Sequence, residues 1–378
     1  MVSYMNILVT GADGFIGKNL VVRLNELHEF NVITFVRNED NNALRVKLSV
    51  ADVVIHLAGE NRPSSKDGFQ QGNFELTNQL CSFMSDLDQK TPLVITSSTQ
   101  ACLDNPYGVS KLAAENCAKS LSASHGNPVV IYRLPGVFGK WCKPNYNSVV
   151  ATFCHNIANG LPIEVHDSQN LLNLVYIDDV ISSILEILRN KFLPVVSRNV
   201  ISPSYSISVG ELAQTIEGFK SSRGSLISDR VGSGLVRALY ATYISYLPAV
   251  NFTYPLTGHV DERGMFVEML KTQDSGQFSF FTAHPGITRG GHYHHTKSEK
   301  FLVVKGTADF GFRQIISGET YRIQTSDKEP RVVETIPGWA HNITNIGNDL
   351  MIVMLWANEV FDRENPDTIA SEVSNEKT

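Results

Sequence analysis

The sequence has few cysteines, and no pattern that would pair them. Five cysteines occur among 378 residues, all before residue 155, and none lies in a Cys-x-x-Cys motif. An odd number without paired spacing argues against a disulfide framework and against a thiolate zinc site, so we expect reduced, buried thiols. The five are Cys81, Cys102, Cys117, Cys142 and Cys154.

Long apolar runs and an excess of positive charge are also missing. No run reaches the roughly 18 apolar residues of a membrane-spanning helix, and the first residues lack the charged region of a signal peptide. A formal net charge of −6 offers no basic surface for nucleic acid or an anionic membrane. We therefore expect a cytoplasmic protein with neither partner.

What the chain does contain predicts two domains. A length of 378 residues exceeds one ordinary core, and 42% hydrophobic residues is a globular balance. Strand and helix patterns alternate up to residue 246, whereas short strand patterns separated by turns follow from 255 to 365. We expect an α/β domain over 1–246, an all-β barrel or sandwich over 255–365, and a disordered polar tail over 366–378.

A glycine-rich turn follows the first predicted strand. Gly11, Gly14 and Gly17 stand between an apolar strand at 6–10 and a helix with apolar residues at helical spacing. Strand, glycine turn and helix together form the fingerprint of a dinucleotide site, where the helix terminus meets a pyrophosphate. A later strand ends in small residues at the same sheet edge. The predicted cofactor contacts are Gly11, Asp13, Gly14, Phe15, Ile16, Gly17, Leu57 and Ala58.

Arg37 ends the second predicted strand, about 20 residues after the last glycine. An acidic residue there would select NAD through the ribose hydroxyl, whereas arginine suits a 2′-phosphate. We therefore expect NADPH, the alternative being an exposed arginine that merely closes a strand. About fifteen residues separate Arg37 from the next strand, so the nucleotide fold is expected to be trimmed on this side.

Tyr107 and Lys111 lie one helical turn apart at the start of a predicted helix. An ammonium near a phenol lowers its pKa and equips it to move a proton at a carbonyl or alcohol oxygen. A strand at 93–96 followed by Ser97, Ser98 and Thr99 would bring a hydroxyl to the same place. Taken alone, Tyr-x-x-x-Lys is also compatible with an ordinary surface pair, and the serines with a turn.

Residues 5–245 resemble the extended short-chain dehydrogenase/reductases that act on nucleotide sugars. The resemblance is carried by the glycine turn, His56-Leu-Ala-Gly59, Ser97-Ser-Thr99, Tyr107-Gly-Val-Ser-Lys111, residues 132–139 and residues 174–180. It implies a Rossmann fold and a catalytic set of Thr99, Tyr107 and Lys111, with Ser98 as the second choice for the hydroxyl. Dehydratases of this group have an acidic pair where Gln100 and Ala101 stand, which argues against water elimination, and Gly136 stands where the family often has asparagine.

Basic residues after the nucleotide core are candidates for the substrate. Arg133 and Lys143, the latter on an aromatic loop, suit the pyrophosphate of a UDP-sugar. An ordinary solvated loop is an equally good interpretation of Lys143 alone. Extended short-chain reductases pair through helices, so the resemblance also implies a homodimer.

Four metal-ligand residue types cluster in the second domain. His292 and His294 are two apart and face the same side of a strand, whereas His295 faces the other side. With Glu299 and His341 they supply three imidazoles and a carboxylate, which suit one divalent transition metal. Zinc fits this set best, with iron, nickel and manganese as alternatives.

The two histidine segments resemble the motifs of the cupin superfamily, although Pro337 and Gly338 are adjacent where one residue usually intervenes. Asp261 to Phe266 and Arg289-Gly-Gly-His292 are similar to the sugar 3,5-epimerase branch of cupins. That branch works without metal and uses as its base the histidine that falls on His292. Its base therefore does not transfer to a residue that is also a metal ligand.

Along nearly the whole chain the sequence resembles bifunctional capsule or O-antigen enzymes that make UDP-2-acetamido-2,6-dideoxy-L-talose, a precursor of UDP-N-acetyl-L-fucosamine. The resemblance implies that the cupin inverts C3 of a UDP-4-keto-6-deoxy-N-acetylhexosamine and that the first domain reduces C4 with NADPH. One alternative is a nucleotide-sugar epimerase that retains NAD and carries a structural cupin. Another is a metal-dependent binding module without turnover.

Overall fold

A computed structural model describes residues 4–63, 65, 68–190, 197–199, 201–364 and 366–373. The chain divides into two compact units. The first unit comprises residues 1–217 and 233–248, and the second comprises 218–232 and 249–378. The main division falls at 248, next to the expected boundary between 246 and 255, and residues 218–232 belong to the second unit.

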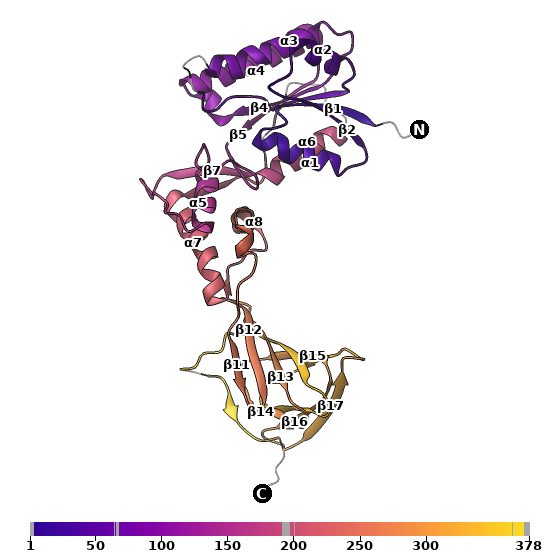
Figure 1. Ribbon diagram of the computed structural model, residues 1–378, viewed down its shortest axis with the longest axis vertical. Coiled ribbons are helices and arrows are strands. Elements are labelled where there is room, and N and C mark those ends of the chain that lie inside the picture. The colour runs from indigo at the N-terminus through magenta and orange to yellow at the C-terminus, as the bar shows by residue number, and fades with distance from the viewer. Residues whose placement is uncertain are drawn as a thin grey trace. The chain divides into compact units, whose positions relative to one another are not determined.

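The first unit contains a six-stranded parallel sheet in the order β2-β1-β3-β4-β5-β8 (Figure 1). β1 and β4 have continuous apolar runs because both faces of the sheet are covered. β2 lies at the edge, in keeping with the expected trimming. The strands are β1 (Met5–Thr10), β2 (Phe30–Phe35), β3 (Val53–His56), β4 (Leu93–Ser98), β5 (Val129–Leu134) and β8 (Ser197–Asn199).

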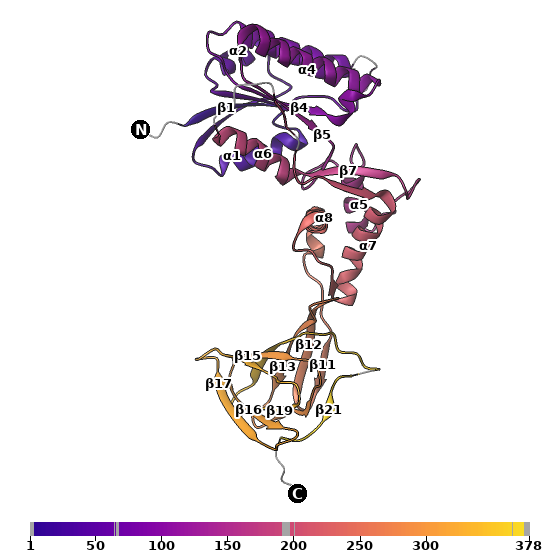
Figure 2. The same cartoon turned by 180° about the vertical axis from the view of Figure 1, so that it is seen from behind.

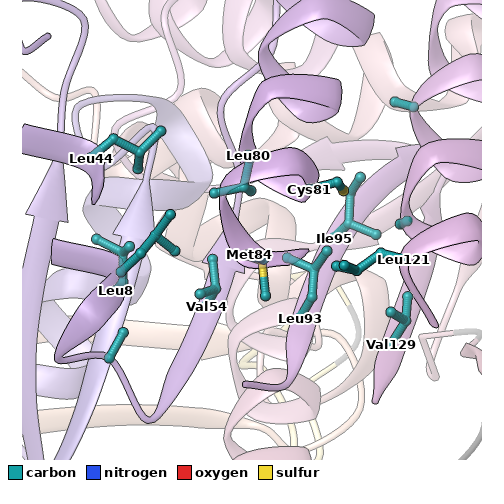
Figure 3. Close-up of a cluster of buried hydrophobic side chains, with 14 of the residues drawn as sticks. Leu8, Leu44, Val54, Leu80, Cys81, Met84, Leu93, Ile95, Leu121 and Val129 are labelled. Carbon is teal, nitrogen blue, oxygen red and sulfur yellow. The ribbon is translucent and has the colours of Figure 1, made fainter. Parts of the chain in front are cut away.

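Helices cover both faces of this sheet and confirm the predicted α/β class. α2, α3 and α4 lie over one face, and α1 and α6 lie over the other (Figures 1 and 2). Figure 3 shows the core under α2, α3 and α4, where Leu8, Val54 and Leu93 from the strands meet Leu80 and Met84 from α3. The helices are α1 (Phe15–Asn25), α2 (Asn41–Ser49), α3 (Leu76–Ser85), α4 (Pro106–His125) and α6 (Ile177–Arg189), with short turns η1 (Gln70–Glu75) and η2 (Thr99–Cys102).

The remaining elements of the first unit form a small lobe. Its three-stranded sheet has the order β6-β7-β9, and α5 packs against α8. α7 begins with a capping box, since the Ser208 hydroxyl accepts from the Glu211 amide and the Glu211 carboxylate accepts from the Ser208 amide. The elements are β6 (Gly136–Phe138), α5 (Val149–Ala158), β7 (Leu171–Tyr176), β9 (Tyr205–Ser208), α7 (Val209–Ser225) and α8 (Gly234–Ile244).

The second unit is rich in β-structure, as predicted, and consists of two sheets. One has the order β10-β12-β13-β20-β15-β18, with β11 paired to β12, and the other has the order β17-β16-β19-β14-β21. Phe281, Phe301 and Phe310, from β13, β15 and β16, meet in their shared core. Neither sheet closes on itself among the described residues.

The bounds of the second unit's elements are as follows: β10 (Ile227–Ser228), η3 (Ala249–Asn251), β11 (Gly258–Asp261), β12 (Gly264–Thr272), β13 (Gln277–Ala283), β14 (Thr288–Tyr293), β15 (Glu299–Lys305), β16 (Thr307–Gln314), β17 (Thr320–Ser326), β18 (Val332–Glu334), β19 (Trp339–Asn345), β20 (Met351–Ala357) and β21 (Ile369–Ala370). β21 lies in the segment predicted to be a disordered tail. Residues 366–373 are instead part of the second unit, whereas 374–378 lie outside the described residues.

Two further expectations can be compared with the fold. All five cysteines are free, but Cys102 is exposed and Cys117 is half-buried, so the prediction of uniformly buried thiols was wrong for these two. No described helix combines the length and the apolar character that crossing a membrane would require.

Candidate active site and metal centre

The glycine-rich turn joins β1 to α1, as predicted. Gly11 has a φ angle of 70°, and a Cβ atom there would lie 2.6 Å from the amide nitrogen of Ala58. A Cβ atom on Gly17 would lie 2.2 Å from the carbonyl oxygen of Gly11. α1 begins at Phe15, and Gly14 at its N-cap position has no side chain to cap it. The backbone amides of this first turn are therefore available to a pyrophosphate.

The other residues predicted to bind the cofactor surround this turn. Asp13 is exposed, and Ile16 and Leu57 are half-buried. Arg37 follows β2, its side chain is 86% exposed, and its guanidinium lies 3.2 Å from the Glu60 carboxylate. A single exposed ion pair of this kind contributes little stability, so the guanidinium is free to exchange partners.

Tyr107 and Lys111 occupy the first turns of α4, directly after the end of β4. Asn105 caps this helix by accepting a hydrogen bond from the Gly108 amide. A Cβ atom on Gly108 would lie 2.2 Å from the carbonyl oxygen of Gln100, so glycine allows the helix to approach the turn after β4. This approach brings Tyr107 to the carboxyl edge of the sheet, where α/β folds bind ligands.

Lys111 is only 8% exposed, and its ammonium donates to the carbonyl oxygen of Thr96 at 2.8 Å. Burial lowers the Lys111 pKa to about 8, although the Glu115 carboxylate opposes this shift. The Tyr107 pKa is raised, because burial outweighs the hydrogen bond with Ser98. The expectation that Lys111 lowers the Tyr107 pKa was therefore wrong for this structure, and the phenol is held in its protonated form.

The two candidate hydroxyls differ in their surroundings. Ser98 is the last residue of β4, is 8% exposed, and contacts Tyr107. Thr99, which the motif favoured, is exposed at the start of η2. The ring of Phe69 covers Tyr107, with the two ring centres 5.7 Å apart.

Arg133 pairs with a buried acid of the same unit. Its Nε and Nη2 atoms donate to Glu115 at 2.6 and 2.8 Å, and Glu115 is fully buried. Burial tends to raise the Glu115 pKa, but hydrogen bonds from Arg133 and Ser97 outweigh it and lower the pKa. These contacts give Arg133 a role in holding α4 against β5, and its role in binding substrate stays a prediction.

The loop that carries Lys143 turns back toward the residues after β3. The Lys143 ammonium lies 4.9 Å from the centre of the Tyr146 ring, and the Tyr146 hydroxyl donates to Glu60 at 3.3 Å. Arg37 and Lys143 therefore lie on the same side of the site, because Arg37 pairs with Glu60 and Lys143 lies over the Tyr146 ring, whose hydroxyl also contacts Glu60. A cavity of about 470 Å³ opens there, lined by Arg62, Asn145, Tyr146, Asn147, Ser148, Val149 and Thr152.

Asn73 holds this site together and was not predicted. It lies on the π-helical segment η1 and is 2% exposed. The side-chain oxygen of Asn73 accepts from the backbone amide of Glu60, and its side-chain nitrogen donates to the backbone carbonyl of Glu60, both at 2.9 Å. The same nitrogen donates to the Ser110 hydroxyl on α4 at 3.0 Å. No sequence motif surrounds Asn73. Only the occurrence of asparagine within a helical pattern could have pointed to it, because asparagine side chains there tend to form local hydrogen bonds.

The predicted metal ligands meet in the second unit. One ligand atom from each of His292, His294, Glu299 and His341 lies within 4.8 Å of all the others. Glu299 Oε2 is 3.4 Å from Nε2 of both His294 and His341. As expected, His295 faces away from this cluster and is exposed. Three imidazoles and a carboxylate, on or directly after the three strands β14, β15 and β19, match the donor set of a transition-metal site.

The electrostatics of this cluster favour a cation. Burial tends to raise the Glu299 pKa, but the imidazoles of His294 and His341, whose Nε2 atoms lie 3.4 Å away, outweigh it and hold the pKa well below its usual range. Burial and the neighbouring His341 lower the His292 pKa to about 4, so this imidazole is neutral at pH 7. The buried Nε2 atom of His341 has no hydrogen-bond partner within the described part of the chain. A metal ion would satisfy this atom, and the donor set fits one.

Comparison with known proteins identifies the family. Residues 7–197 match the model of the NAD dependent epimerase/dehydratase family. This protein belongs to the NAD-dependent epimerase/dehydratase family. Residues 259–369 match the polysaccharide biosynthesis C-terminal domain, so this family member carries a second conserved module.

Two relatives of this family member are similar over nearly its whole length, and a third covers about two thirds of it. A Pseudomonas aeruginosa protein named UDP-2-acetamido-2,6-beta-L-arabino-hexul-4-ose reductase is 54% identical over 369 residues, which cover 98% of this chain and 99% of the relative. The crystal structure of the capsular polysaccharide assembling protein CapF from Staphylococcus aureus is 39% identical, covers 98% of this chain and all of that one, and has a TM-score of 0.90. UDP-glucuronic acid 4-epimerase from Bacillus cereus, solved with NAD, is 20% identical over 64% of this chain with a TM-score of 0.56, and shows the fold alone.

Proposed function

We propose that this protein is an NADPH-dependent nucleotide-sugar reductase with an associated 3-epimerase. Its second unit inverts C3 of a UDP-4-keto-6-deoxy-N-acetylhexosamine, and its first unit then reduces the C4 ketone to give UDP-2-acetamido-2,6-dideoxy-L-talose for capsule or O-antigen synthesis. The observation that carries this proposal is the protonated Tyr107 beside buried Lys111, in a chain 54% identical to a named UDP-sugar 4-ketone reductase.

In the reductase half, the chain's own residues complete the alcohol. NADPH, when bound, supplies the hydride that reaches C4. Tyr107 donates its phenolic proton to the C4 oxygen, so that carbon gains the electron pair and oxygen gains the proton. A hydroxyl donates a hydrogen bond to the same oxygen, and the contact of Ser98 with Tyr107 supports Ser98 over Thr99 for this role. Lys111 contributes positive charge and a donor toward the nicotinamide ribose.

The residues around the glycine turn support NADPH as the cofactor. Gly11 and Gly17 leave the space that a pyrophosphate needs at the N-terminus of α1. Arg37 follows β2, where a 2′-phosphate lies in this fold, and its exposed guanidinium can exchange Glu60 for the phosphate. Lys143, Arg62 and the Tyr146 ring are suited to the pyrophosphate and uracil of a UDP-sugar.

The epimerase half rests on the cluster in the second unit. We assign His292, His294, Glu299 and His341 to one divalent ion, with zinc as the first choice, and the unpartnered Nε2 of His341 supports this assignment. The ion, when bound, supplies positive charge for the oxygen of an enolate formed at C3. The two facing sheets and the cupin-like histidine motifs support a cupin-type barrel for this unit.

We also infer a cytoplasmic location, as expected from the sequence, and a homodimer, as the resemblance implied. α3 and α4 leave a groove between their outer faces that is lined by both polar and apolar side chains, among them Asn78, Ser82 and Leu121. Sedimentation of the purified protein tests the dimer.

The proposed function is tested by incubating the purified protein with NADPH or NADH and the UDP-4-keto-6-deoxy sugar in deuterated water. We expect oxidation of NADPH in preference to NADH, deuterium at C3, and an L-talo product by NMR. Epimerisation without net oxidation of NADPH would instead favour an enzyme that retains NAD. No turnover with several keto sugars would favour a binding module.

A further inference from the structure

The segment 366–373 contacts β14, the strand that carries His292 and is followed directly by His294. β21 pairs with β14, which places Ala370 opposite His292 and Ile369 opposite Tyr293. The Ser371 amide donates to the carbonyl oxygen of Gly291 at 2.9 Å. The C-terminal segment therefore forms an edge of the sheet directly beside the metal-ligand cluster.

Asp367, which precedes β21, makes four hydrogen bonds to the loop between His294 and Glu299 and a fifth to His294 itself. Its carboxylate accepts from the amides of His295, Thr296 and Lys297 at 2.8 to 2.9 Å and from the Thr296 hydroxyl at 3.0 Å. Its backbone carbonyl contacts Nδ1 of His294. One residue thus holds both the imidazole of His294 and the chain that leads from His294 to Glu299.

The contact with the Asp367 carbonyl determines which ring nitrogen of His294 carries the proton. A carbonyl oxygen only accepts hydrogen bonds, so Nδ1 of His294 must carry the proton. In the neutral ring, the lone pair then resides on Nε2, the nitrogen that lies 3.4 Å from Oε2 of Glu299. The Asp367 carbonyl therefore selects the tautomer in which His294 can ligate a metal within the cluster.

The contacts with the loop act on the other ligand. Lys297 is 7% exposed, and its ammonium lies 3.1 Å from Oε1 of Glu299. The same lysine's amide is held by the Asp367 carboxylate at 2.8 Å. Fixing this loop keeps the Lys297 ammonium on Oε1, which leaves Oε2 facing the histidines.

We propose that Asp367 is a positioning residue of the metal centre, which fixes the tautomer of His294 through its carbonyl and the orientation of Glu299 through the loop at 295–297. This inference rests on the proposed metal-binding function. It assigns to the C-terminal segment a part in building the site, although none of its residues belongs to the ligand set.

The test measures Zn²⁺ affinity of the full-length protein by competition with a chromogenic chelator. Asp367→Ala keeps the backbone carbonyl but removes the carboxylate that anchors it to the loop at 295–297, so this variant should bind Zn²⁺ about 10 to 100-fold more weakly than the unaltered protein. Asp367→Asn retains one acceptor oxygen and should recover part of this loss. Ser371→Ala is the matched control, because it removes one hydrogen bond of the same segment, to Arg313, away from the ligand loop. Its affinity should be unchanged.

A spectroscopic readout separates positioning from stability. With Co²⁺ in place of Zn²⁺, Asp367→Ala should change the visible absorption of the bound ion, whereas Ser371→Ala should not. Unchanged affinity and spectrum in Asp367→Ala would overturn the inference alone. A lower unfolding midpoint of the chelator-treated variant with unchanged affinity would do the same, since Asp367 would then only stabilise the fold. If the unaltered protein bound no Zn²⁺, the proposed metal function would fail as well.

Discussion

The two units build their candidate sites in opposite ways. In the first, Ser98, Tyr107 and Lys111 come from one strand end and the first turns of the next helix, within fourteen residues of sequence. In the second, the four ligands come from β14, β15 and β19 and are spread over fifty residues, from His292 to His341. The first site depends on how closely one helix approaches one strand, and the second depends on how two sheets face each other, because β14 and β19 belong to one sheet and β15 to the other.

Burial also acts differently at the two sites. It raises the Tyr107 pKa and lowers that of Lys111 to about 8, so both groups are shifted toward their neutral forms. At Glu299, burial is outweighed by the nearby imidazoles of His294 and His341, and the carboxylate stays ionised. The first site is therefore suited to transferring a proton, whereas the second is suited to holding a cation.

Replacing the phenol should give the largest effect and separate the two units. In Tyr107→Phe the proton donor is missing, so kcat for NADPH oxidation should fall by about 10² to 10⁴-fold. Deuterium exchange at C3 should persist, because the metal cluster is unaltered. Stopped-flow absorbance and NMR measure the two activities. Loss of both together would contradict a division of labour between the units.

Replacing a metal ligand should abolish epimerisation at C3 and leave the reduction of C4 intact. His292→Gln should weaken Zn²⁺ binding by more than about 100-fold, since it removes a direct ligand rather than an outer partner. C3 exchange should be lost, whereas reduction of an already epimerised ketone should remain. His295→Gln is the control, because this neighbouring histidine faces away from the cluster. If His292→Gln kept its metal but lost exchange, His292 would be a proton-transfer base, as in the metal-free epimerase branch.

Most of both sites could be predicted because their spacing has a direct geometric meaning. The spacing of His292 and His294 fixes a shared strand face, and that of Tyr107 and Lys111 fixes one helical turn. Gly11 and Gly17 were identified because close backbone approaches exclude side chains. These signals do not depend on the rest of the fold.

The residues that were missed act through partners far away in sequence. Asp367 lies 73 residues after His294 and bonds its imidazole, and Asn73 lies 37 residues before Ser110. A polar tail and an isolated asparagine carry no periodic pattern, and only tertiary pairing gives them a role. Arg133 shows the converse, because the sequence suggested a substrate ligand, whereas this arginine lies within β5 and already pairs with Glu115.

The hydroxyl of the first site gives a smaller and sharper test. Ser98→Ala should lower kcat by about 100-fold, the usual loss when one donor to a developing oxyanion is removed. Thr99→Ala should change kcat little, because Thr99 is exposed whereas Ser98 contacts Tyr107. Steady-state kinetics of the two variants compare them directly. A larger loss of kcat in Thr99→Ala than in Ser98→Ala would instead assign the catalytic hydroxyl to Thr99, which the family motif favours.

The pH dependence of kcat/KM should show the smallest effect, and it should reveal whether Lys111 or Tyr107 titrates first. The kcat/KM for NADPH reports groups of the free enzyme. Because the Lys111 pKa is lowered to about 8 whereas the Tyr107 pKa is raised, the ammonium is lost first as pH rises. We therefore expect kcat/KM to fall about tenfold per pH unit above pH 8. In Lys111→Met this limb should disappear at a lower overall value. A limb that survives in Lys111→Met would assign the titration to Tyr107, and burial at the first site would then not be the dominant influence on its chemistry.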